Sequence, residues 1–470
     1  MPDFSVIQQM PEVRAIVQEN ILERAFHDAL FPRVLFRGEA TPQIFPANVG
    51  DTMAFTGVGL IKTKQQALRP GADPLPSTYQ YEQWTAQLQQ WADSIDTHMP
   101  TSNVAIADLF KRNAHQMGLS AAQTLNRIAR NKLYNASLAG HTVADQAQTG
   151  VTALRVKRLN GFTRARRPDL PSGSPVRFDI VSTNNPLAVK IYDQTGPAEV
   201  SRKVIGFTPD VAGDETGPGI ITLNTAVTVL NRAYVVADNS TYLVRVGGSV
   251  NKSIDDLGSG DLLDLASVRT AVGRMWGMNV PEQPDGRFHC HLDPVAQGQI
   301  FADDEFQRLL TALPDMYYYK QFAVGEMLNT VFYRNSECPL PETVEGGLTG
   351  TFDQSDPFAG ELKNASNIRV HRSLFVGHDF MYEYYQDLGS LITDAGIVGK
   401  VGSFSITNSG IEVFTSDRVQ LIIRAPLNRL QDLVSTSWKF IGDFPVRTDV
   451  TTGDAAAYKR VVCVESGEAA

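Results

Sequence analysis

Cysteine is scarce in this chain of 470 residues, where Cys290, Cys338 and Cys463 stand far apart in the sequence. They form no Cys-x-x-Cys pair, so a disulfide framework and a zinc ribbon are excluded, and the usage fits a reducing compartment. Long apolar runs are also lacking, since no stretch approaches the roughly 18 residues of a membrane-spanning helix. The first residues, Met-Pro-Asp-Phe-Ser, carry neither the basic n-region nor the apolar h-region of a signal peptide. We therefore expect a soluble protein made inside the cell.

Catalytic sequence motifs are missing as well. No Gly-x-Ser-x-Gly elbow occurs that would present a nucleophile on a strained turn. The segment from Gly396 to Lys400 lacks the spacing of a phosphate-binding loop. We therefore expect no catalytic residues, no cofactor and no enzymatic activity.

Two histidines, His289 and His291, lie on one face of a predicted strand, a spacing that could chelate a metal ion. No acidic residue or third histidine stands at an evident partner spacing, and the strand ends directly in Asp293-Pro294. A structural role is favoured for both rings. A metal-dependent hydrolase that uses them remains an alternative.

The charge balance is acidic, with a net charge of −9 and an isoelectric point near 5.5. Dedicated nucleic-acid binders are normally basic, so the composition argues against that class. One basic cluster stands out, and we expect a solvated face rather than a phosphate-binding or subunit-pairing surface. Its members are Arg155, Lys157, Arg158, Arg164, Arg166 and Arg167.

The stretch from residue 51 to 140 has the most distinctive pattern. Residues 51–68 are strand-like, the Pro- and Gly-rich residues 69–76 predict a loop tip, and residues 78–93 predict a return strand. A helical pattern follows over residues 102–139, with Gly118 and a capping box at Ser120 that predict two helices or one kinked helix. A long two-stranded hairpin is marginal alone in water, so we expect it to lie on a neighbouring molecule.

The rest of the chain divides into a β-rich stretch and a mixed region. Residues 145–255 alternate short β-branched runs with turn residues. The elements expected after them are a helix at 261–276, a strand at 287–292, a helical stretch at 294–313, strands at 326–334 and 368–376, a short helix at 378–388, strands within 400–424 and a last strand at 459–465.

Four motifs, taken in their order, resemble the major capsid proteins of tailed bacteriophages. They are Gly50-Asp51-Thr52-Met53-Ala54-Phe55, Phe288-His289-Cys290-His291-Leu292-Asp293-Pro294, Gly325-Glu326-Met327-Leu328-Asn329, and the stretch from Arg424-Ala425-Pro426 to Trp438-Lys439. The resemblance covers most of the chain outside residues 145–255. It implies an α+β fold with an N-terminal arm, an E-loop hairpin, a spine helix, and peripheral and axial domains, to which this chain adds a β-rich insertion domain. The implied segments are the arm at 1–50, the E-loop at 51–93, the spine helix at 94–144, the insertion at 145–255, the axial domain at 256–400 and C-terminal peripheral strands at 401–470.

The resemblance also implies a function. A protein of this kind self-assembles into hexamers and pentamers of an icosahedral head around double-stranded DNA, formed in the cytoplasm of a bacterial host. Partners would include a portal protein and a decoration or cement protein, with non-specific contact to packaged DNA and no membrane. A tail tube or sheath component is the alternative structural reading. Because aromatic residues dominate interface hot spots, we expect assembly contacts at Tyr79, Tyr81, Trp84, Phe380, Tyr382, Tyr384 and Tyr385.

Overall fold

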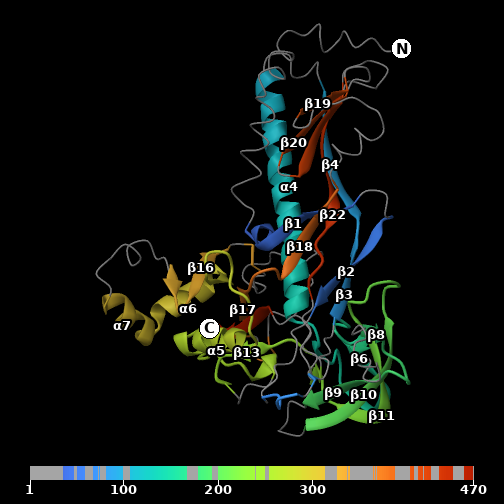
Figure 1. Cartoon of the computed structure of the whole chain (residues 1–470), viewed down its shortest axis with the longest axis vertical. Coiled ribbons are helices and arrows are strands. Elements are labelled where there is room, and N and C mark those ends of the chain that lie inside the picture. Colours follow the sequence, from blue (N-terminus) through green and yellow to red (C-terminus); the bar gives the residue numbers. More distant parts are fainter. Residues whose placement is uncertain are drawn as a thin grey trace. The chain divides into compact units, whose positions relative to one another are not determined.

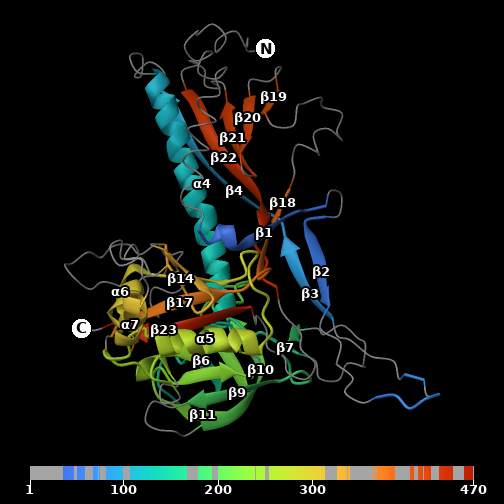
Figure 2. The same cartoon turned by 60° about the vertical axis from the view of Figure 1, so that its left-hand side comes forward.

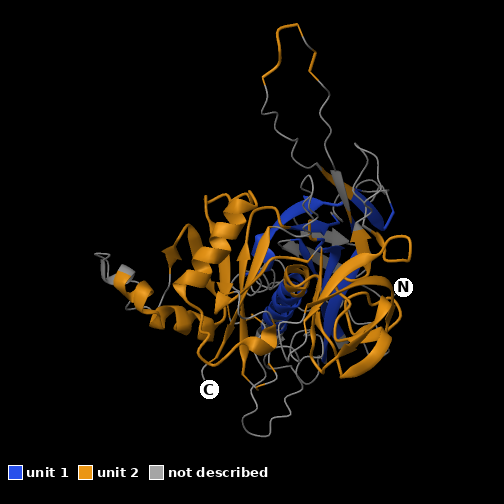
Figure 3. Ribbon diagram, turned by 90° about the horizontal axis from the view of Figure 1, so that it is seen from below, with its two compact units in different colours: residues 1–54, 85–130, 381–445 blue, residues 55–84, 131–380, 446–470 orange. Residues whose placement is uncertain are grey.

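The computed structural model divides the chain into two compact units, coloured in Figure 3. Unit 1 comprises residues 1–54, 85–130 and 381–445, and unit 2 comprises residues 55–84, 131–380 and 446–470. The structure describes residues 35–46, 50–58, 67–71, 73–74, 81–98, 106–166, 178–192, 199–238, 240–248, 253–312, 325–335, 337–338, 364, 366, 368–386, 403–406, 411–416, 418–424, 433–447 and 460–468. Residues 1–34 of the expected N-terminal arm lie outside this described part.

A single helix, α4 (Ile106–Ser137), runs for 32 residues, which corresponds to about 48 Å at 1.5 Å per residue. Of the two alternatives expected from Gly118 and Ser120, two separate helices are wrong, because α4 is one continuous helix through both residues. A glycine inside a helix costs about 1 kcal/mol, and the burial of its neighbours Met117 and Ala121 offsets that cost.

Unit 1 is built on a seven-stranded sheet in the order β1-β18-β22-β21-β20-β19, with β4 also paired to β22. Part of α4 lies alongside this sheet (Figures 1 and 2), and Ser120 contacts Asp93 and Trp438 by hydrogen bonds. The strands are β1 (Ala40–Ile44), β4 (Gln89–His98), β18 (Met381–Tyr385), β19 (Ser403–Ile406), β20 (Ile411–Ser416), β21 (Val419–Arg424) and β22 (Leu433–Asp443), and a short 3-10 helix, η2 (Arg37–Glu39), precedes β1.

The short helix expected at 378–388 is wrong, because β18 occupies that segment and pairs with β1 in parallel. Its sequence, Met-Tyr-Glu-Tyr-Tyr, is rich in aromatic residues, which favour a pleated and half-buried surface. Asp379 has a φ of 53°, in the left-handed region that ends one strand and allows the turn into the next.

The single return strand expected at 78–93 is two strands. β3 (Tyr81–Gln87) pairs with β2 (Thr52–Val58) in a two-stranded sheet, which forms the paired part of the hairpin among the described residues. After Leu88 the chain continues as β4, which pairs with β22 over ten residues. The amide of Leu88 donates to the carbonyl of Asp51, 2.8 Å away, and closes the base of the hairpin.

The first sheet of unit 2 has the order β5-β12-β9-β10-β11-β6. Its alternating apolar residues form a buried core with Phe162 and Leu159, so the β-rich character expected from the sequence is present. The strands are β5 (His141–Val143), β6 (Gln148–Val156), β9 (Leu187–Tyr192), β10 (Glu199–Pro209), β11 (Gly219–Val229) and β12 (Tyr234–Ala237), with a separate pair, β7 (Arg164–Arg166) and β8 (Phe178–Ile180).

The second sheet of unit 2 has the order β13-β23-β17-β14-β16-β15. Its strands are β13 (Leu243–Arg245), β14 (Phe288–Leu292), β15 (Glu326–Met327), β16 (Thr330–Arg334), β17 (Val370–Val376) and β23 (Val461–Gly467). The last strand of the chain therefore leaves the sheet of β19 to β22 and pairs with β17 and β13.

Helices accompany this second sheet (Figure 2). They are α5 (Leu265–Gly277), α6 (Pro294–Ala302), α7 (Asp304–Ala312) and the short 3-10 helix η5 (Ile254–Asp256). Asp264 caps α5 and Asp293 caps α6, each by accepting a backbone N–H with its side chain. The helical stretch expected at 294–313 is thus two helices separated by Asp303. Among the helices that the structure describes, none is long and apolar enough to cross a membrane.

Candidate functional sites

The base of the hairpin is held by a cluster around Trp84. The indole stacks on Phe55 with ring centroids 6.5 Å apart, and the guanidinium of Arg447 lies 5.6 Å above the indole ring. A Cβ atom at Gly57 would lie 2.8 Å from the indole, so only glycine lets the ring pack this closely. These contacts fix Trp84 within its own chain while the residue stays partly exposed.

The other aromatic residues expected at interfaces have different surroundings. Tyr79 lies outside the described residues, and Tyr81 is described only as part of β3. Phe380 is fully buried, and Tyr382 and Tyr384 are buried with their rings 5.8 Å apart. Tyr385 is partly exposed, with Arg418 over its ring at 5.7 Å. The structure thus gives Phe380, Tyr382 and Tyr384 a place in the interior of the chain itself.

An acidic residue between two of these tyrosines went unnoticed in the sequence. The carboxylate of Glu383 is fully excluded from solvent and accepts hydrogen bonds from Nε and Nη2 of Arg37, at 2.9 and 2.6 Å. Nη1 of Arg418 lies 2.7 Å from its second oxygen. The sequence signal for this buried site is a single carboxylate inside an aromatic strand. Nothing in the sequence indicates which arginines form ion pairs with it.

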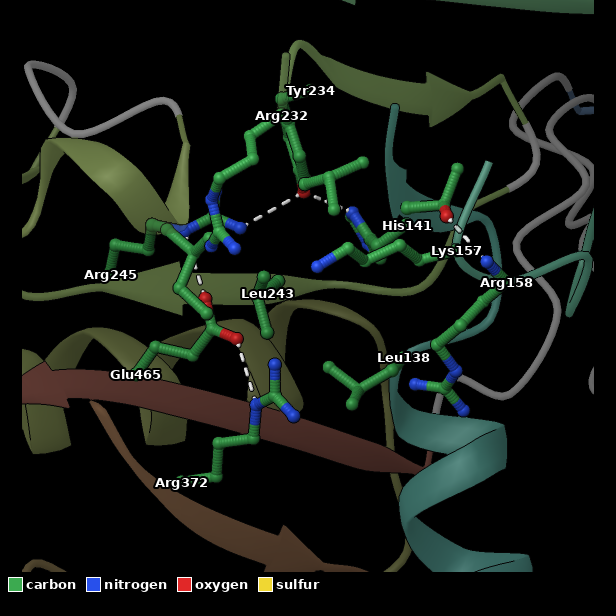
Figure 4. Close-up of a pocket in the computed structure, with 13 residues that line it drawn as sticks. Leu138, His141, Lys157, Arg158, Arg232, Tyr234, Leu243, Arg245, Arg372 and Glu465 are labelled. Atoms are coloured by element: carbon green, nitrogen blue, oxygen red, sulfur yellow. Dashed lines mark hydrogen bonds and ion pairs between the residues drawn. The ribbon is translucent and has the colours of Figure 1, made fainter. Parts of the chain in front are cut away.

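A second buried carboxylate, Glu465 on β23, lies at the wall of the pocket drawn in Figure 4. One oxygen accepts from Nε of Arg245 at 2.9 Å, and the other accepts from Nε of Arg372 at 3.0 Å. Nη2 of Arg245 also donates to the hydroxyl of Tyr234, 3.0 Å away. Tyr234 in turn contacts Nδ1 of His141, whose Nε2 lies 2.9 Å from the carbonyl oxygen of Thr241.

This network joins the two sheets of unit 2, because Glu465, Arg245 and Arg372 stand on the second sheet and Tyr234 and His141 on the first. Burial alone would raise the pKa of Glu465, yet the charges of Arg245 and Arg372 lower it below its ordinary value. Such a carboxylate stays ionised and holds both guanidinium groups in place.

His141 is a base, so burial disfavours its protonated form and lowers its pKa. Burial lowers the pKa of His141 to about 4, partly countered by its contact with the Thr241 carbonyl and reinforced by the charge of Arg245. The ring is therefore neutral at pH 7. Tyr234, beside it, has a pKa raised by burial.

Three more cations, Lys157, Arg158 and Arg232, complete the polar wall of the pocket (Figure 4). Arg232 pairs with Asp255 at 2.9 Å, and Arg158 is buried with a hydrogen bond to Asn135. Leu138, Val143, Leu243 and Ile254 supply apolar surface. The pocket is open to solvent, with a cavity volume of ≈ 30 Å³ and an unfilled volume of ≈ 440 Å³ when the open solvent is included.

The basic cluster expected from the sequence is dispersed. Arg155 pairs with Asp145 at 3.2 Å and with Asp210 at 2.7 Å, and Arg164 pairs with Glu215 at 3.3 Å. These arginines are solvated and balanced by acids of the same part of the chain. Lys157 and Arg158 instead face the pocket or the interior, and Arg167 lies outside the described residues.

The histidine pair His289 and His291 packs on one aromatic ring, that of Tyr333, with centroid distances of 5.1 and 5.7 Å. His289 also contacts Asp285 at 3.2 Å, and His291 is buried near Asn335. Within the described part of the chain, no group of three or more His, Cys, Asp or Glu side chains is placed to hold a metal ion.

The three cysteines are all free and buried. Burial raises the pKa of Cys290 and of Cys463 well above the ordinary value of a thiol, and the nearby thiol of Cys338 adds to this in both. Tyr134 lies close to them, and its hydroxyl donates to the backbone carbonyl of Arg372, 3.2 Å away. The sequence separates these residues widely, so only the fold brings them together.

No known family profile and no curated protein sequence matches the chain. Among solved structures, it is similar to the capsid of the cyanophage P-SCSP1u, at 10% identity over 93% of this chain and 88% of that chain, with a TM-score of 0.45. It is also similar to the capsid of Ralstonia phage GP4, at 14% identity over 93% and 92%, with a TM-score of 0.44. A third is the capsid of cyanophage Pam1, at 9% identity over 94% and 93%, with a TM-score of 0.47.

Proposed function

We propose that this chain is a major capsid protein, a structural subunit that assembles with its own copies into hexamers and pentamers of an icosahedral shell around double-stranded DNA. The observation that carries the proposal is the hairpin of β2 and β3. Among the described strands, these two pair only with each other. An isolated two-stranded sheet is marginal in water, and its open edges invite pairing. A neighbouring subunit supplies the missing support.

The tip of the hairpin fits the same role. All of its described residues, 67–71 and 73–74, are exposed, and Leu68 exposes 49% of its surface. The tip contains Pro70 and Gly71, which form a turn. A rigid turn with an exposed apolar side chain suits contact with another copy of the chain.

The long helix and the seven-stranded sheet suit a shell subunit for a different reason. In unit 1, residues 106–130 of the 32-residue helix α4 lie beside a sheet whose longest strand has eleven residues, which gives this unit long regular elements. Closed symmetric assemblies repeat one set of contacts many times, so each subunit has to present its contact surfaces in a fixed geometry. The motif order described for the sequence leads to the same class of protein.

The remaining parts of the proposal follow from this class. The subunit resides in the virion after assembly in the bacterial cytoplasm, contacts a portal protein and a decoration or cement protein, and carries no catalytic role. Its net charge of −9 suits weak, non-specific contact with packaged DNA. Tyr79, Tyr81, Trp84 and Tyr385 are the aromatic residues proposed for subunit contacts. Phe380, Tyr382 and Tyr384 act at such contacts only indirectly, by supporting the strand that carries Tyr385.

Deletion of residues 64–76 tests the proposal. The shortened protein is expected to remain folded by circular dichroism and to form no stable shells in negative-stain micrographs. The matched control removes the exposed residues 211–213 from the connection between β10 and β11 and leaves the hairpin intact. The control is expected to assemble like the unchanged protein.

Two results would contradict the proposal. Normal particle yield from the 64–76 deletion would remove the role of the hairpin, and tubes in place of closed shells or hexamers would point to a tail component. Stoichiometric zinc in the purified protein that is lost on His289→Ala would restore the hydrolase alternative.

A further inference from the structure

We propose that the pocket between the two sheets of unit 2 binds a phosphate-type oxyanion. The pocket lies at the ends of β5, β12 and β13, with β23 at its base (Figure 4). Its cationic lining residues are Lys157, Arg158, Arg232, Arg245 and Arg372, whereas Glu465 is the only carboxylate among the residues that line it. A concave surface with one dominant sign of charge attracts counter-ions of the opposite sign.

The acids near the pocket are already engaged, so they compete little with a bound anion. Both oxygens of Glu465 accept from arginine Nε groups. Asp255 accepts from Nε of Arg232 with both oxygens, each at 3.0 Å. The negative charge at the wall is thus matched by three arginines, and Lys157 adds positive charge beyond these pairs.

Lys157 is the residue that distinguishes the pocket from a purely structural ion-pair cluster. Its backbone N–H donates to the carbonyl of Val143 at 3.0 Å, and the next amide, of Arg158, donates to the hydroxyl of Thr142 at 3.1 Å. This backbone anchoring fixes the start of the side chain, which extends into the pocket (Figure 4). Among the ion pairs that the described residues form, none includes Lys157, and the side chain is only partly exposed.

The chemistry of the wall selects the kind of ligand. Guanidinium groups recognise oxyanions through directed N–H donors, and an ammonium group adds a compact charge, so together they suit phosphate or sulfate. The open mouth of the pocket leaves room for a group attached to the oxyanion. The ligand is therefore free inorganic phosphate or a phosphate group of a nucleic acid, and both present the same tetrahedral oxyanion.

Thermal unfolding of the purified, unassembled chain tests the site with inorganic phosphate as the probe, against sodium chloride of equal ionic strength. Binding to the folded state alone raises the melting temperature as the phosphate concentration exceeds its dissociation constant. We expect a rise in phosphate beyond that in chloride, and binding weaker by a factor of about ten or more for Lys157→Gln, since this variant loses a hydrogen bond from a charged group. Lys157→Arg keeps the charge and is expected to keep the response.

The control is Lys190→Gln, which removes a lysine of the same sheet that pairs with Glu199 outside the pocket. This variant is expected to respond to phosphate like the unchanged chain. Equal responses of Lys157→Gln and the unchanged chain, or no response beyond chloride, would overturn the proposal. Loss of folding in Lys157→Gln would leave Lys157→Arg and direct phosphate titration calorimetry of the unchanged chain to decide.

A second binding experiment distinguishes free inorganic phosphate from a phosphate group of a nucleic acid. A short 5′-phosphorylated oligonucleotide that binds more tightly than inorganic phosphate, and loses that advantage in Lys157→Gln, would identify nucleic acid as the source. Tighter binding of inorganic phosphate would identify the free anion. Because the measurement uses unassembled protein, its outcome is independent of whether shells form.

Discussion

Arg37 and Glu383 form a buried ion pair that joins residues 346 positions apart in the sequence, with two nitrogens of Arg37 on one carboxylate oxygen. Removing one partner of such a pair leaves an uncompensated buried charge, which destabilises a protein by about 3–5 kcal/mol. We expect Glu383→Ala to lower the free energy of unfolding by that amount, measured by urea denaturation. Arg418 loses its contact with the second oxygen of Glu383 in the same variant.

The control for this prediction is Glu199→Ala, which breaks the exposed pair with Lys190. Exposed pairs contribute about 0–1 kcal/mol, so this variant should unfold close to the unchanged protein. A similar loss of stability in both variants would mean that burial of Glu383 has no special energetic role.

Gly161 is predicted to tolerate no side chain. Its φ is +81°, and a Cβ atom there would lie 2.1 Å from the backbone nitrogen of Gly140, just after the end of α4. Gly161→Ala should therefore destabilise the chain by about 3 kcal/mol or more, since backbone strain and overpacking add. Gly213→Ala is the matched control, because Gly213 also has a positive φ but no atom within 4 Å.

Gly213→Ala is expected to lower the free energy of unfolding by only about 1–2 kcal/mol, the cost of the left-handed conformation itself. Thermal denaturation of the two variants measures the difference. Equal melting temperatures would show that the backbone near Gly140 moves to admit a methyl group.

Stability should fall as the pH is lowered from 6.5 toward 4. The pKa of His141 is about 4 in the folded chain against an ordinary 6.5, so the unfolded chain takes up a proton in this range that the folded chain does not. The loss amounts to about 3 kcal/mol at most, at 1.36 kcal/mol per pKa unit. Urea titrations between pH 7 and pH 5 check this prediction.

The range from pH 7 to pH 5 separates the effect of His141 on stability from that of Glu465. The pKa of Glu465 lies below its ordinary 4.5, so the stability that Glu465 contributes is present above pH 4.5 and is lost only at lower pH. A His141→Gln variant should show a flatter pH dependence between pH 7 and 5. An unchanged slope in that variant would assign the effect to another histidine.

The three thiols should be unreactive in the folded protein. Cys290, Cys338 and Cys463 are buried, and a thiol attacks reagents only as an accessible thiolate. We expect no cysteine to react with a thiol reagent at pH 8 under native conditions and all three to react in guanidinium chloride. Rapid labelling of the native chain would show local opening around β14 and β23.

Much of the element order could be predicted from the sequence. The strand start after Asp51, the helical pattern of α4 and the strand that ends just before Asp293 follow from local chemistry. The strand β18 could not be predicted, because Met-Tyr-Glu-Tyr-Tyr is too short to separate a period of 2 from a period of 3.6. The division into β3 and β4 depends on pairing with β22, which lies over 300 residues further along the chain.

The buried ion-pair networks could not be predicted from the sequence either. Glu465 meets Arg245 across 220 residues and Arg372 across 93, and no local pattern encodes either distance. The aromatic composition of residues 380–385 is typical of an interface, but Phe380, Tyr382 and Tyr384 are buried in the interior of the chain. Only burial distinguishes an aromatic residue of the core from one available to a partner.

The continuity of β3 and β4 gives the subunit a mechanical property. Only Leu88 separates the two strands. In the proposed assembly, a neighbouring subunit that binds the hairpin would therefore exert tension on β4 through the backbone. The ten residue pairs between β4 and β22, from Leu433 with His98 to Gly442 with Gln89, share that tension along the whole ladder. In the proposed shell, tension from a neighbouring subunit would thus reach the seven-stranded sheet through β4.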